Sequence, residues 1–147
     1  MNMTLPVEFE TAARSEMPFI EDYIRDFRLD DEDLQAEQFI VLRKSGRIVA
    51  FGRIKPYGED IYELGCVAVL EDERRQGLGK KVVQELIRRF PVREIYVTTD
   101  LHSYFERFGF DRITAAPPQI RAKLQRVCGR LRTGVVAMVL RKDATSK

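Results

Sequence analysis

The sequence has few of the features that mark metal sites, disulfide frameworks or membrane proteins. It contains one histidine, His102, and two cysteines, Cys66 and Cys128, whose spacing matches no metal-binding pair. We therefore expect no metal site and two reduced thiols, as in cytosolic proteins. No apolar run approaches the ~20 residues that span a bilayer, and Met1–Glu10 is neither basic nor apolar enough for a signal peptide. These absences predict a cytoplasmic protein without a membrane partner.

An excess of charge of one sign is also lacking. The 147 residues include 25 Lys and Arg against 23 Asp and Glu. Because nucleic-acid binding needs a basic face, this balance argues against nucleic acid as the main partner. The length fits one domain, and no repeat, linker or low-complexity segment interrupts it. We expect a single domain over residues 1–147, with residues 143–147 as a frayed tail.

The first half of the chain has the hydrophobic pattern of an antiparallel meander. Alternating or short continuous apolar runs predict strands over residues 7–11, 39–42, 48–54 and 61–69. Glycine-containing turns join the last three of these strands as hairpins. Between the first two strands, Met17, Ile20 and Ile24 recur at helical spacing, and Ser15 precedes them as a candidate N-cap.

The second half alternates helices with strands. Helices are predicted over residues 82–90 and 101–108 and from residue 117, and strands over 94–98 and 135–140. Asp100 is the candidate cap of the second of these helices. A strand, a helix and a strand in succession form a crossover, which implies parallel pairing. The predicted class is therefore α/β with a mixed sheet, an antiparallel N-terminal meander followed by a parallel βαβ crossover.

The turn over residues 74–80, with the sequence RRQGLGK, carries the strongest chemical signal. It leads from an apolar strand into an amphipathic helix, whose first N–H groups are unpaired and lie at the positive end of the dipole. Gly77 and Gly79 let an anion approach the backbone closely, and the arginines and lysine add positive charge. Together these features predict a phosphate-binding turn.

Two common phosphate motifs do not fit this turn. The P-loop pattern needs a glycine where Arg74 stands and Ser or Thr where Lys81 stands. The dinucleotide fingerprint needs a third glycine where Val82 stands. The ligand is therefore of another kind.

The remaining pattern is Arg74-x-x-Gly77-x-Gly79 after the segment Val67–Val69. It resembles the coenzyme-A-binding motif of the GNAT acetyltransferase superfamily. The resemblance covers nearly the whole chain, because the meander, the motif, the next strand and residues 104–110 (YFERFGF) follow the family's order. It implies the GNAT fold and the direct transfer of an acetyl group from acetyl-CoA to an amine, without a metal or a covalent enzyme intermediate.

The resemblance also implies how acetyl-CoA is held. In such enzymes the strand before the motif splays from its neighbour, so that backbone groups at Val67 and Val69 pair with the pantetheine arm. The amides over residues 75–80 hold the pyrophosphate. The implied cofactor-binding residues are Val67, Ala68, Val69, Arg74, Arg75, Gln76, Gly77, Leu78, Gly79, Lys80 and Phe105.

A narrower resemblance concerns the acceptor. Residues 97–110 (VTTDLHSYFERFGF) are similar to the acetyltransferase domain of the bacterial N-acetylglutamate synthases and to their single-domain relatives. The full synthases also carry an amino-acid-kinase-like domain, which this sequence does not contain. The leading acceptor is a small amine, an amino acid such as glutamate among them. A protein or peptide amine and a non-catalytic acetyl-CoA sensor or partner-binding module are the alternatives, and a homodimer is compatible with the resemblance.

Glu63 is the candidate general base. Acetyl transfer needs a group that removes a proton from the attacking amine, often through water, and some family members place a base on this strand. Strict alternation puts Glu63 on the same face as Val67 and Val69, with Cys66 on the opposite face. The alternative is an exposed strand glutamate without a role. The main-chain N–H of Val67 is the candidate oxyanion donor.

The general acid has several candidates. Many family members use a tyrosine at the position of Phe105, which has no proton to give. Tyr104 is adjacent, although on a helix it points about 100° away. The alternatives are that Tyr104 only packs, that water supplies the proton, or that the thiolate leaves unassisted. The missing tyrosine also favours the sensor hypothesis.

Three further residues are candidate substrate contacts. Arg53 is a candidate for binding a carboxylate, Thr98 for binding the substrate or the pantetheine, and His102 for contacting the substrate. The alternatives are a structural role for the histidine and a helix cap for the threonine. A basic stretch formed by Arg121, Lys123, Arg126, Arg130 and Arg132 either captures a carboxylate or is a solvated helix face.

Overall fold

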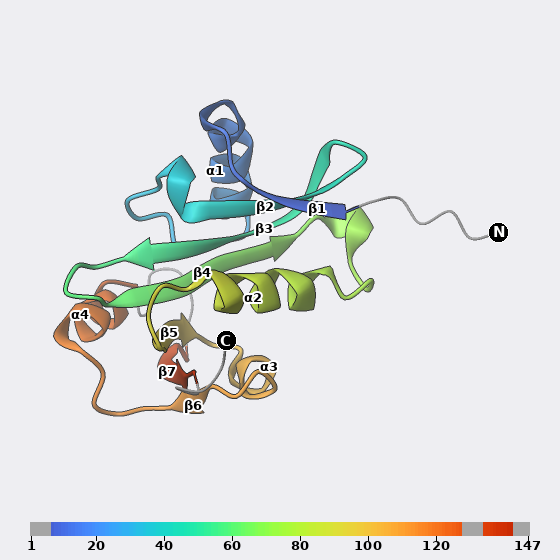
Figure 1. Ribbon diagram of the computed structural model, residues 1–147. Helices are drawn as coiled ribbons and strands as arrows, with labels where there is room; N and C mark the ends of the chain where they lie inside the picture. Colours follow the sequence, from blue (N-terminus) through green and yellow to red (C-terminus); the bar gives the residue numbers. More distant parts are fainter. Residues whose placement is uncertain (1–6, 128–133, 143–147) are drawn as a thin grey trace.

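The computed structural model describes residues 7–127 and 134–142 (Figure 1). In this part of the chain, seven strands form one mixed sheet in the order β1-β2-β3-β4-β5-β7-β6. The strands are β1 (Val7–Thr11), β2 (Phe39–Lys44), β3 (Arg47–Pro56), β4 (Tyr62–Val69), β5 (Glu94–Thr99), β6 (Asp111–Arg112) and β7 (Val136–Arg141). The α-helices are α1 (Met17–Asp26), α2 (Leu78–Arg89), α3 (His102–Glu106) and α4 (Pro118–Val127). The predicted mixed α/β class is confirmed.

The sheet has an antiparallel half and a crossover. β1 to β4 pair as the antiparallel meander that the sequence predicts. β4 and β5 are parallel and are connected by α2, which confirms the predicted crossover. β7 and β6 continue the sheet in antiparallel fashion. The sequence did not predict β6, because a strand of two residues has no hydrophobic period and forms only by pairing with β7.

Two predicted helix caps are wrong. Ser15 lies inside a 3₁₀ turn that precedes α1. Asp100 precedes Leu101, which takes the N-cap position of α3 without a side-chain capping bond. The amide of Leu101 instead donates to Thr99 Oγ1 at 2.8 Å. Short polar side chains next to one another compete for the same backbone donor, and the sequence does not show which one succeeds.

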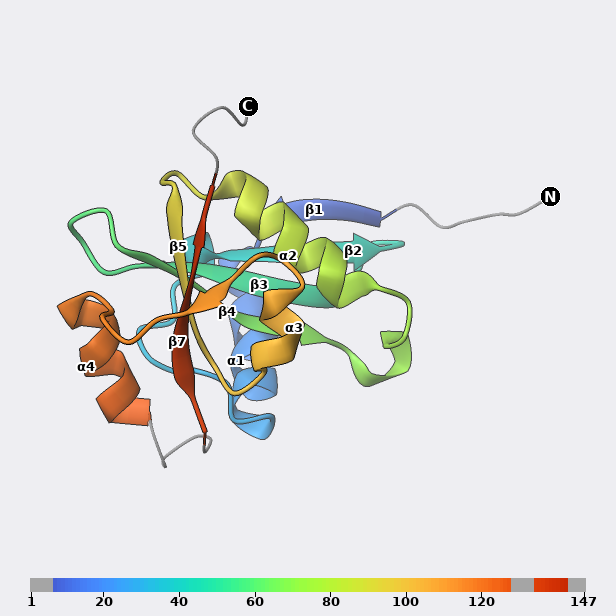
Figure 2. The same ribbon diagram turned by 90° about the horizontal axis from the view of Figure 1, so that it is seen from below.

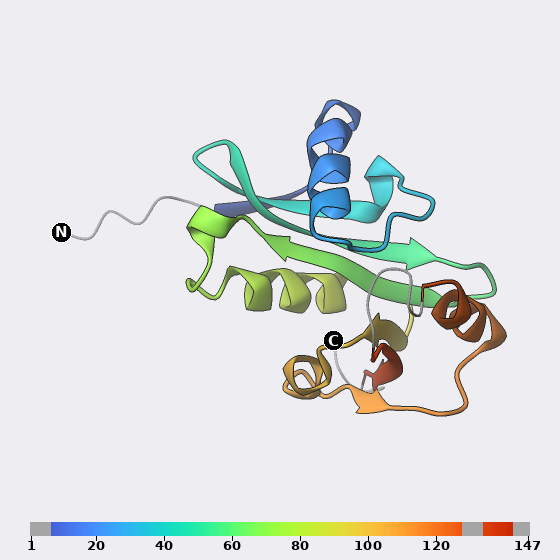
Figure 3. The same ribbon diagram turned by 180° about the vertical axis from the view of Figure 1, so that it is seen from behind.

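Helices cover both faces of the sheet. α1 packs on one face of the meander and α2 on the other (Figures 1 and 2). α4 packs on β5 and β7 and lies beside the turn between β3 and β4 (Figure 3). α3 shares the α2 face, because Phe105 belongs to the same buried cluster as Val82 and Leu86. Gly52 lets α2 approach β3 closely, since an added Cβ there would lie 2.6 Å from Leu86 Cδ1 and 2.7 Å from Val82 Cγ1.

A β-bulge interrupts β4. Gly52 of β3 lies opposite two residues of β4, Cys66 and Val67. Cys66 has a positive φ of 50°. One extra residue inverts the alternation of side chains between the two faces. As a result Leu64 and Val67 both pack toward α2, whereas Cys66 and Ala68 pack toward α1.

β4 and β5 are paired at one point and then diverge. Within the described chain, the registered pair between them joins Glu63 to Tyr96. Beyond this pair the C-terminal ends of both strands line a cavity instead of pairing with each other. This is the splay that the family resemblance implies, and it places Glu63 where the gap begins.

Candidate active site

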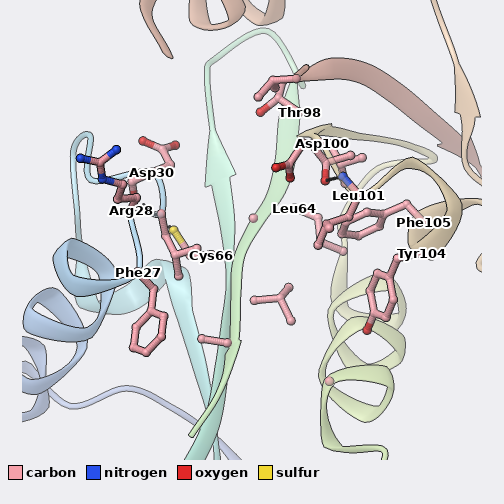
Figure 4. A pocket seen from close by; sticks show the side chains of 18 of the residues that line it. Phe27, Arg28, Asp30, Leu64, Cys66, Thr98, Asp100, Leu101, Tyr104 and Phe105 are labelled. Carbon is pink, nitrogen blue, oxygen red and sulfur yellow. Dashed lines mark hydrogen bonds between the residues drawn. The ribbon is translucent and has the colours of Figure 1, made fainter. Parts of the chain in front are cut away.

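A cavity of about 460 Å³ occupies the gap between the diverging strands (Figure 4). Its walls come from β4, from the end of β5 and the start of α3, from residues 27–30 after α1, and from Lys123 of α4. A second cavity of about 600 Å³ lies at the start of α2. Because both cavities are lined by Val69, Gly79 and Tyr104, they are two parts of one cleft.

The part of the cleft at the start of α2 suits an anion. Gly77 takes the N-cap position of α2 with φ of 74°, a conformation that favours glycine. The first N–H groups of a helix lack intrahelical partners and lie at the positive end of its dipole. Arg75 and Lys80 line this part, and Arg107 adds a third cation that follows α3. The arrangement matches the binding of a phosphate group.

Most residues predicted to bind the cofactor line the cleft. They are Val67, Ala68, Val69, Arg74, Arg75, Gly77, Leu78, Gly79, Lys80 and Phe105. The Gln76 side chain turns away and donates to Glu73 Oε1 at 3.4 Å. Arg74 lies along the end of β4, where it donates to the Val69 carbonyl and to the Tyr23 hydroxyl, each at 3.0 Å. The turn therefore offers backbone groups and cations to both parts of the cleft.

Tyr104 and Phe105 both line the cleft. The Tyr104 hydroxyl points toward α2 (Figure 4) and would lie 3.2 Å from a Cβ added at Gly79. Burial raises the pKa of Tyr104, although Arg107, 5.3 Å from its ring, opposes this. Tyr104 thus keeps its proton at neutral pH. Phe105 is buried and packs edge-to-face against the Tyr104 ring, with their centroids 5.2 Å apart.

Glu63 lies at the narrow end of the cleft, where β4 and β5 are still paired, and its side chain is 2% exposed. Its carboxylate accepts hydrogen bonds from Tyr57 Oη at 2.8 Å and from Lys123 Nζ at 2.6 Å, and a third from the Thr98 hydroxyl. Because Glu63 is buried and bonded in this way, the alternative of an exposed strand glutamate is wrong. The bond from Thr98 was not among the roles that the sequence suggested for this threonine.

The predicted face of Glu63 is also wrong. Alternation placed Glu63 opposite Cys66, but the bulge brings both onto the face covered by α1 and α4. The Cys66 thiol lies 3.2 Å from the Asp30 carbonyl, and Lys123 contacts both Asp30 and Glu63. Burial raises the pKa of Cys66 to about 12, so this thiol stays protonated. A bulge has no signature in the hydrophobic pattern, so the inversion could not be predicted.

Three charged side chains form a buried cluster at this end. Lys123 Nζ lies 2.6 Å from Glu63 Oε2 and 2.8 Å from Asp30 Oδ2. Burial disfavours the ammonium, but the two carboxylates outweigh it and raise the pKa of Lys123. Burial also disfavours the Asp30 carboxylate, but Lys123 outweighs it, and the pKa of Asp30 is lowered. Burial and the Glu63 carboxylate raise the pKa of Tyr57.

Two predicted substrate contacts do not line the cleft. Arg53 is 1% exposed, and its guanidinium donates to the carbonyls of Glu32 and Asp33 and to Gln38 Oε1. It holds the segment after α1 against β3 and is not available to a substrate carboxylate. His102 Nε2 lies 3.1 Å from the Gly134 carbonyl, a contact within the chain.

The basic stretch is not a uniform solvated face. Lys123 is 3% exposed, whereas Arg121 is exposed and Arg126 forms an exposed ion pair with Glu32. Arg130, Arg132 and the second cysteine, Cys128, lie outside the described residues, as does the predicted tail. The sequence carried a signal for Lys123, because it follows Ile120 by three residues on the apolar stripe of α4.

Other residues of the cleft were missed. Asp30 lines the cleft and lies in an irregular acidic segment where no periodicity applies. Tyr57, which lies in a turn, does not line the cleft but donates a hydrogen bond to Glu63. Asp100 also lines the cleft, with its carboxylate directed into the gap between β4 and β5 (Figure 4). Among the residues that the structure describes, there is no group of three His, Cys, Asp or Glu side chains placed to hold a metal ion. No helix in those same ranges has the length and apolar character needed to cross a membrane.

Comparison with known proteins gives one family. A model of the acetyltransferase (GNAT) family matches residues 6–110. No curated protein matches the chain.

Solved structures share the fold. The chain is similar to N-acetylglutamate synthase from Neisseria gonorrhoeae complexed with coenzyme A and N-acetyl-glutamate, with a TM-score of 0.78 and 20% identity over 94% of this chain and 35% of the synthase. It thus spans about a third of that relative. It is also similar to Rv2747 from Mycobacterium tuberculosis in complex with CoA, with a TM-score of 0.76 and 20% identity over 91% of this chain and 98% of that one. A third relative is diaminobutyrate acetyltransferase from Paenibacillus lautus in complex with L-2,4-diaminobutyric acid and coenzyme A, with a TM-score of 0.64 and 17% identity over 93% and 95% of the two chains.

Proposed function

The chain belongs to the acetyltransferase (GNAT) family, and on that premise we propose that it transfers the acetyl group of acetyl-CoA directly to the amine of a small molecule, such as an amino acid. The observation that carries the proposal is the continuous cleft between β4 and β5. It joins an anion-binding helix start at one end to a buried carboxylate at the other. The cytoplasmic location and the homodimer remain predictions of the sequence.

The cleft fits the phosphate-bearing arm of acetyl-CoA. The amides at the start of α2, with Arg75 and Lys80, would hold the pyrophosphate. The bulge supports a role for the backbone at Val67, because an extra residue leaves ladder groups unpaired. That N–H would pair with the pantetheine arm or stabilise the oxyanion. An alanine at Gly79 would narrow the cleft where its two parts meet.

The reaction needs a proton acceptor and a proton donor. We assign the acceptor role to Glu63, which takes the proton of the amine through water, because its carboxylate lies where the gap begins. We assign the donor role toward the leaving thiolate to Tyr104, whose raised pKa keeps it protonated and whose ring lines both parts of the cleft. Phe105, which lacks a hydroxyl, packs against it.

A non-catalytic acetyl-CoA sensor is the second candidate. It is favoured by the three hydrogen bonds that already occupy Glu63 and by the phenylalanine at the position of the family's tyrosine. In that case the cleft would bind acetyl-CoA without turnover.

Thiol release separates the two candidates. We would follow free coenzyme A from acetyl-CoA with a panel of amino acids, diamines, polyamines and peptides, and measure acetyl-CoA binding by calorimetry. Release that depends on a small amine supports the proposal. Tight binding without release on any amine supports the sensor, and release only with peptides replaces the small amine by a protein substrate.

A further inference from the structure

We propose that Lys123 is a positioning residue for acetyl transfer, whose buried ammonium fixes the acceptor-side wall of the cleft relative to Glu63. This inference rests on the proposed function and deepens it. The acceptor wall is defined as residues 27–30, all of which line the cavity. In Figure 4 the labelled members Phe27, Arg28 and Asp30 lie across β4 from Thr98 and Asp100.

Lys123 joins three separate segments. Its ammonium comes from α4, and its two carboxylate partners are Glu63 on β4 and Asp30 at the end of the acceptor wall. The exposed fractions of the three side chains are 4%, 2% and 12%. Removing one partner of such a buried ion pair costs far more free energy than removing one partner of an exposed pair, because the remaining charge stays buried without compensation.

The acceptor wall has other contacts that keep it near the sheet. Arg53 donates to the carbonyls of Glu32 and Asp33, just after the wall. The Cys66 thiol lies 3.2 Å from the Asp30 carbonyl. These contacts hold the backbone, whereas the closest cation to the Asp30 carboxylate is Lys123 at 2.8 Å, with Arg53 and Lys55 at 3.7 Å. Loss of Lys123 is therefore expected to disturb the cleft more than the fold.

The charged and polar groups around Asp30 and Glu63 indicate that the Lys123 ammonium offsets the repulsion between these two carboxylates. Asp30 faces Lys123 from α4, Lys55 and Arg53 from β3 at 3.7 Å each, and Glu32 from its own segment. Glu63 faces Tyr57, Thr98 and Lys123. Two carboxylates at one end of a cleft repel each other, and a cation between them offsets that repulsion. Lys123 thus keeps the Asp30 carboxylate of the wall charged and holds it in register with Glu63.

The test compares two variants on the same helix. Lys123→Met removes the buried ammonium, and Arg126→Met removes an exposed pair to Glu32 on the segment that follows the wall. For Lys123→Met we expect the KM for the acceptor to rise about tenfold or more and kcat to fall, with the Kd for acetyl-CoA within about twofold of wild type. The acid limb of kcat/KM is expected to move to higher pH, because Asp30 loses its nearest cation. For Arg126→Met we expect the acceptor KM, kcat and the Kd for acetyl-CoA to stay within about twofold of wild type. We also expect the acid limb to stay at the wild-type pH.

A structural role would give another result. If Lys123→Met and Arg126→Met, both folded by circular dichroism, have the same acceptor KM and the same acid limb, the proposal is wrong. If Lys123→Met does not fold, Lys123→Arg keeps the charge and is expected to restore the wild-type acid limb and part of the acceptor KM. An arginine variant with a tenfold raised KM and a shifted acid limb would overturn the proposal.

One readout does not depend on turnover. The Asp30 carboxyl carbon, followed by NMR during an acid titration, is expected to titrate at higher pH in Lys123→Met than in wild type. If wild type releases no thiol with any amine, the proposed function fails, and the Asp30 titration still reports on Lys123. An unchanged Asp30 titration would show that Lys123 does not set the charge of the wall, and would overturn the inference by itself.

Discussion

Glu63 has two proposed roles with different requirements, one as a proton acceptor and one as a structural hydrogen-bond partner. As a proton acceptor it must have an oxygen that water or substrate can reach. As the partner of Tyr57, Thr98 and Lys123 it ties β4 to the turn before it, to β5 and to α4. A carboxylate has room for about four donors, so three protein bonds leave one position for water. Its place at the start of the gap allows both tasks at once.

We expect Glu63→Gln to lower kcat by about a hundredfold to ten-thousandfold, the usual contribution of a general base. The amide cannot take a proton, whereas it keeps the size of the side chain. The Kd for acetyl-CoA, measured by calorimetry, is expected to stay within about twofold, since the anion-binding turn is at the other end of the cleft. A melting curve controls for the lost bond to Lys123. An unchanged rate with an unchanged pH profile would assign the base elsewhere.

At the residue scale, the sequence predicted which local motif forms the turn before α2 better than it predicted where single side chains such as Arg53 and His102 point. The motif over residues 74–80 correctly indicated a turn that brings glycines and cations to the start of α2, because these residues act through local backbone geometry. Arg53 and His102 were misplaced, because their partners, Glu32, Asp33 and Gly134, are distant in the sequence or lie in irregular segments. Burial of a charged side chain depends on such partners, which no local pattern displays.

At the element scale, α2 and β3 depend on close approach. Val82, Val83 and Leu86 are fully buried under the meander, and the helix lies so near that Gly52 leaves no room for a side chain. The same helix begins at the turn over residues 74–80. The distance between α2 and the sheet therefore affects both the packing of the core and the width of the cleft between Gly79 of α2 and the end of β4.

Gly52→Ala tests this packing. An added Cβ would lie 2.6 Å from Leu86 Cδ1 and 2.7 Å from Val82 Cγ1, so α2 must shift. We expect the free energy of unfolding to fall by about 1–3 kcal/mol, as for other overpacked cores. Gly65→Ala on β4 is the matched control, because a Cβ there meets nothing within 4 Å. Equal urea midpoints for the two variants would contradict the close approach.

The elements themselves were largely predictable, and their irregularities were not. Alternating or continuous apolar runs and helical spacing predicted β1 to β5, β7 and the four α-helices, because these patterns are local. The bulge at Cys66 and the short strand β6 are set by pairing across the sheet. The bulge then overturned the predicted face of Glu63, which shows how one inserted residue changes the interpretation of a whole site.

At the scale of the whole molecule, acidic side chains are held by cations throughout the fold. Within residues 7–127 and 134–142, such partners lower the pKa values of five of them, namely Glu16, Asp30, Glu32, Glu73 and Glu85. A carboxyl whose pKa is lower in the folded state stabilises the fold above its unfolded pKa. That contribution is lost as the pH falls through the folded pKa.

We therefore expect the free energy of unfolding to decrease below about pH 4, the unfolded pKa range of Asp and Glu. Of the five carboxyls, Asp30 pairs with the most deeply buried cation, Lys123, whose side chain is 4% exposed, so Asp30→Asn is expected to destabilise the protein most at neutral pH. The difference from wild type should shrink on acidification, because the wild-type carboxyl is then protonated as well. Urea unfolding between about pH 3 and pH 7 measures both curves. A difference that does not depend on pH would mean that the charge of Asp30 contributes nothing.

The single pair between β4 and β5 has a consequence for cooperativity. A continuous ladder makes neighbouring strands open together, but here the ladder ends after Glu63 and Tyr96. Beyond this pair, the two strands are held by the buried cluster that they share with α2 and by the ion pair between Lys123 and Glu63. Without a ligand, we therefore expect faster amide exchange in β5, β7 and β6 than in the meander. A substrate arm bound between β4 and β5 would contact both halves of the sheet and reduce this difference in exchange.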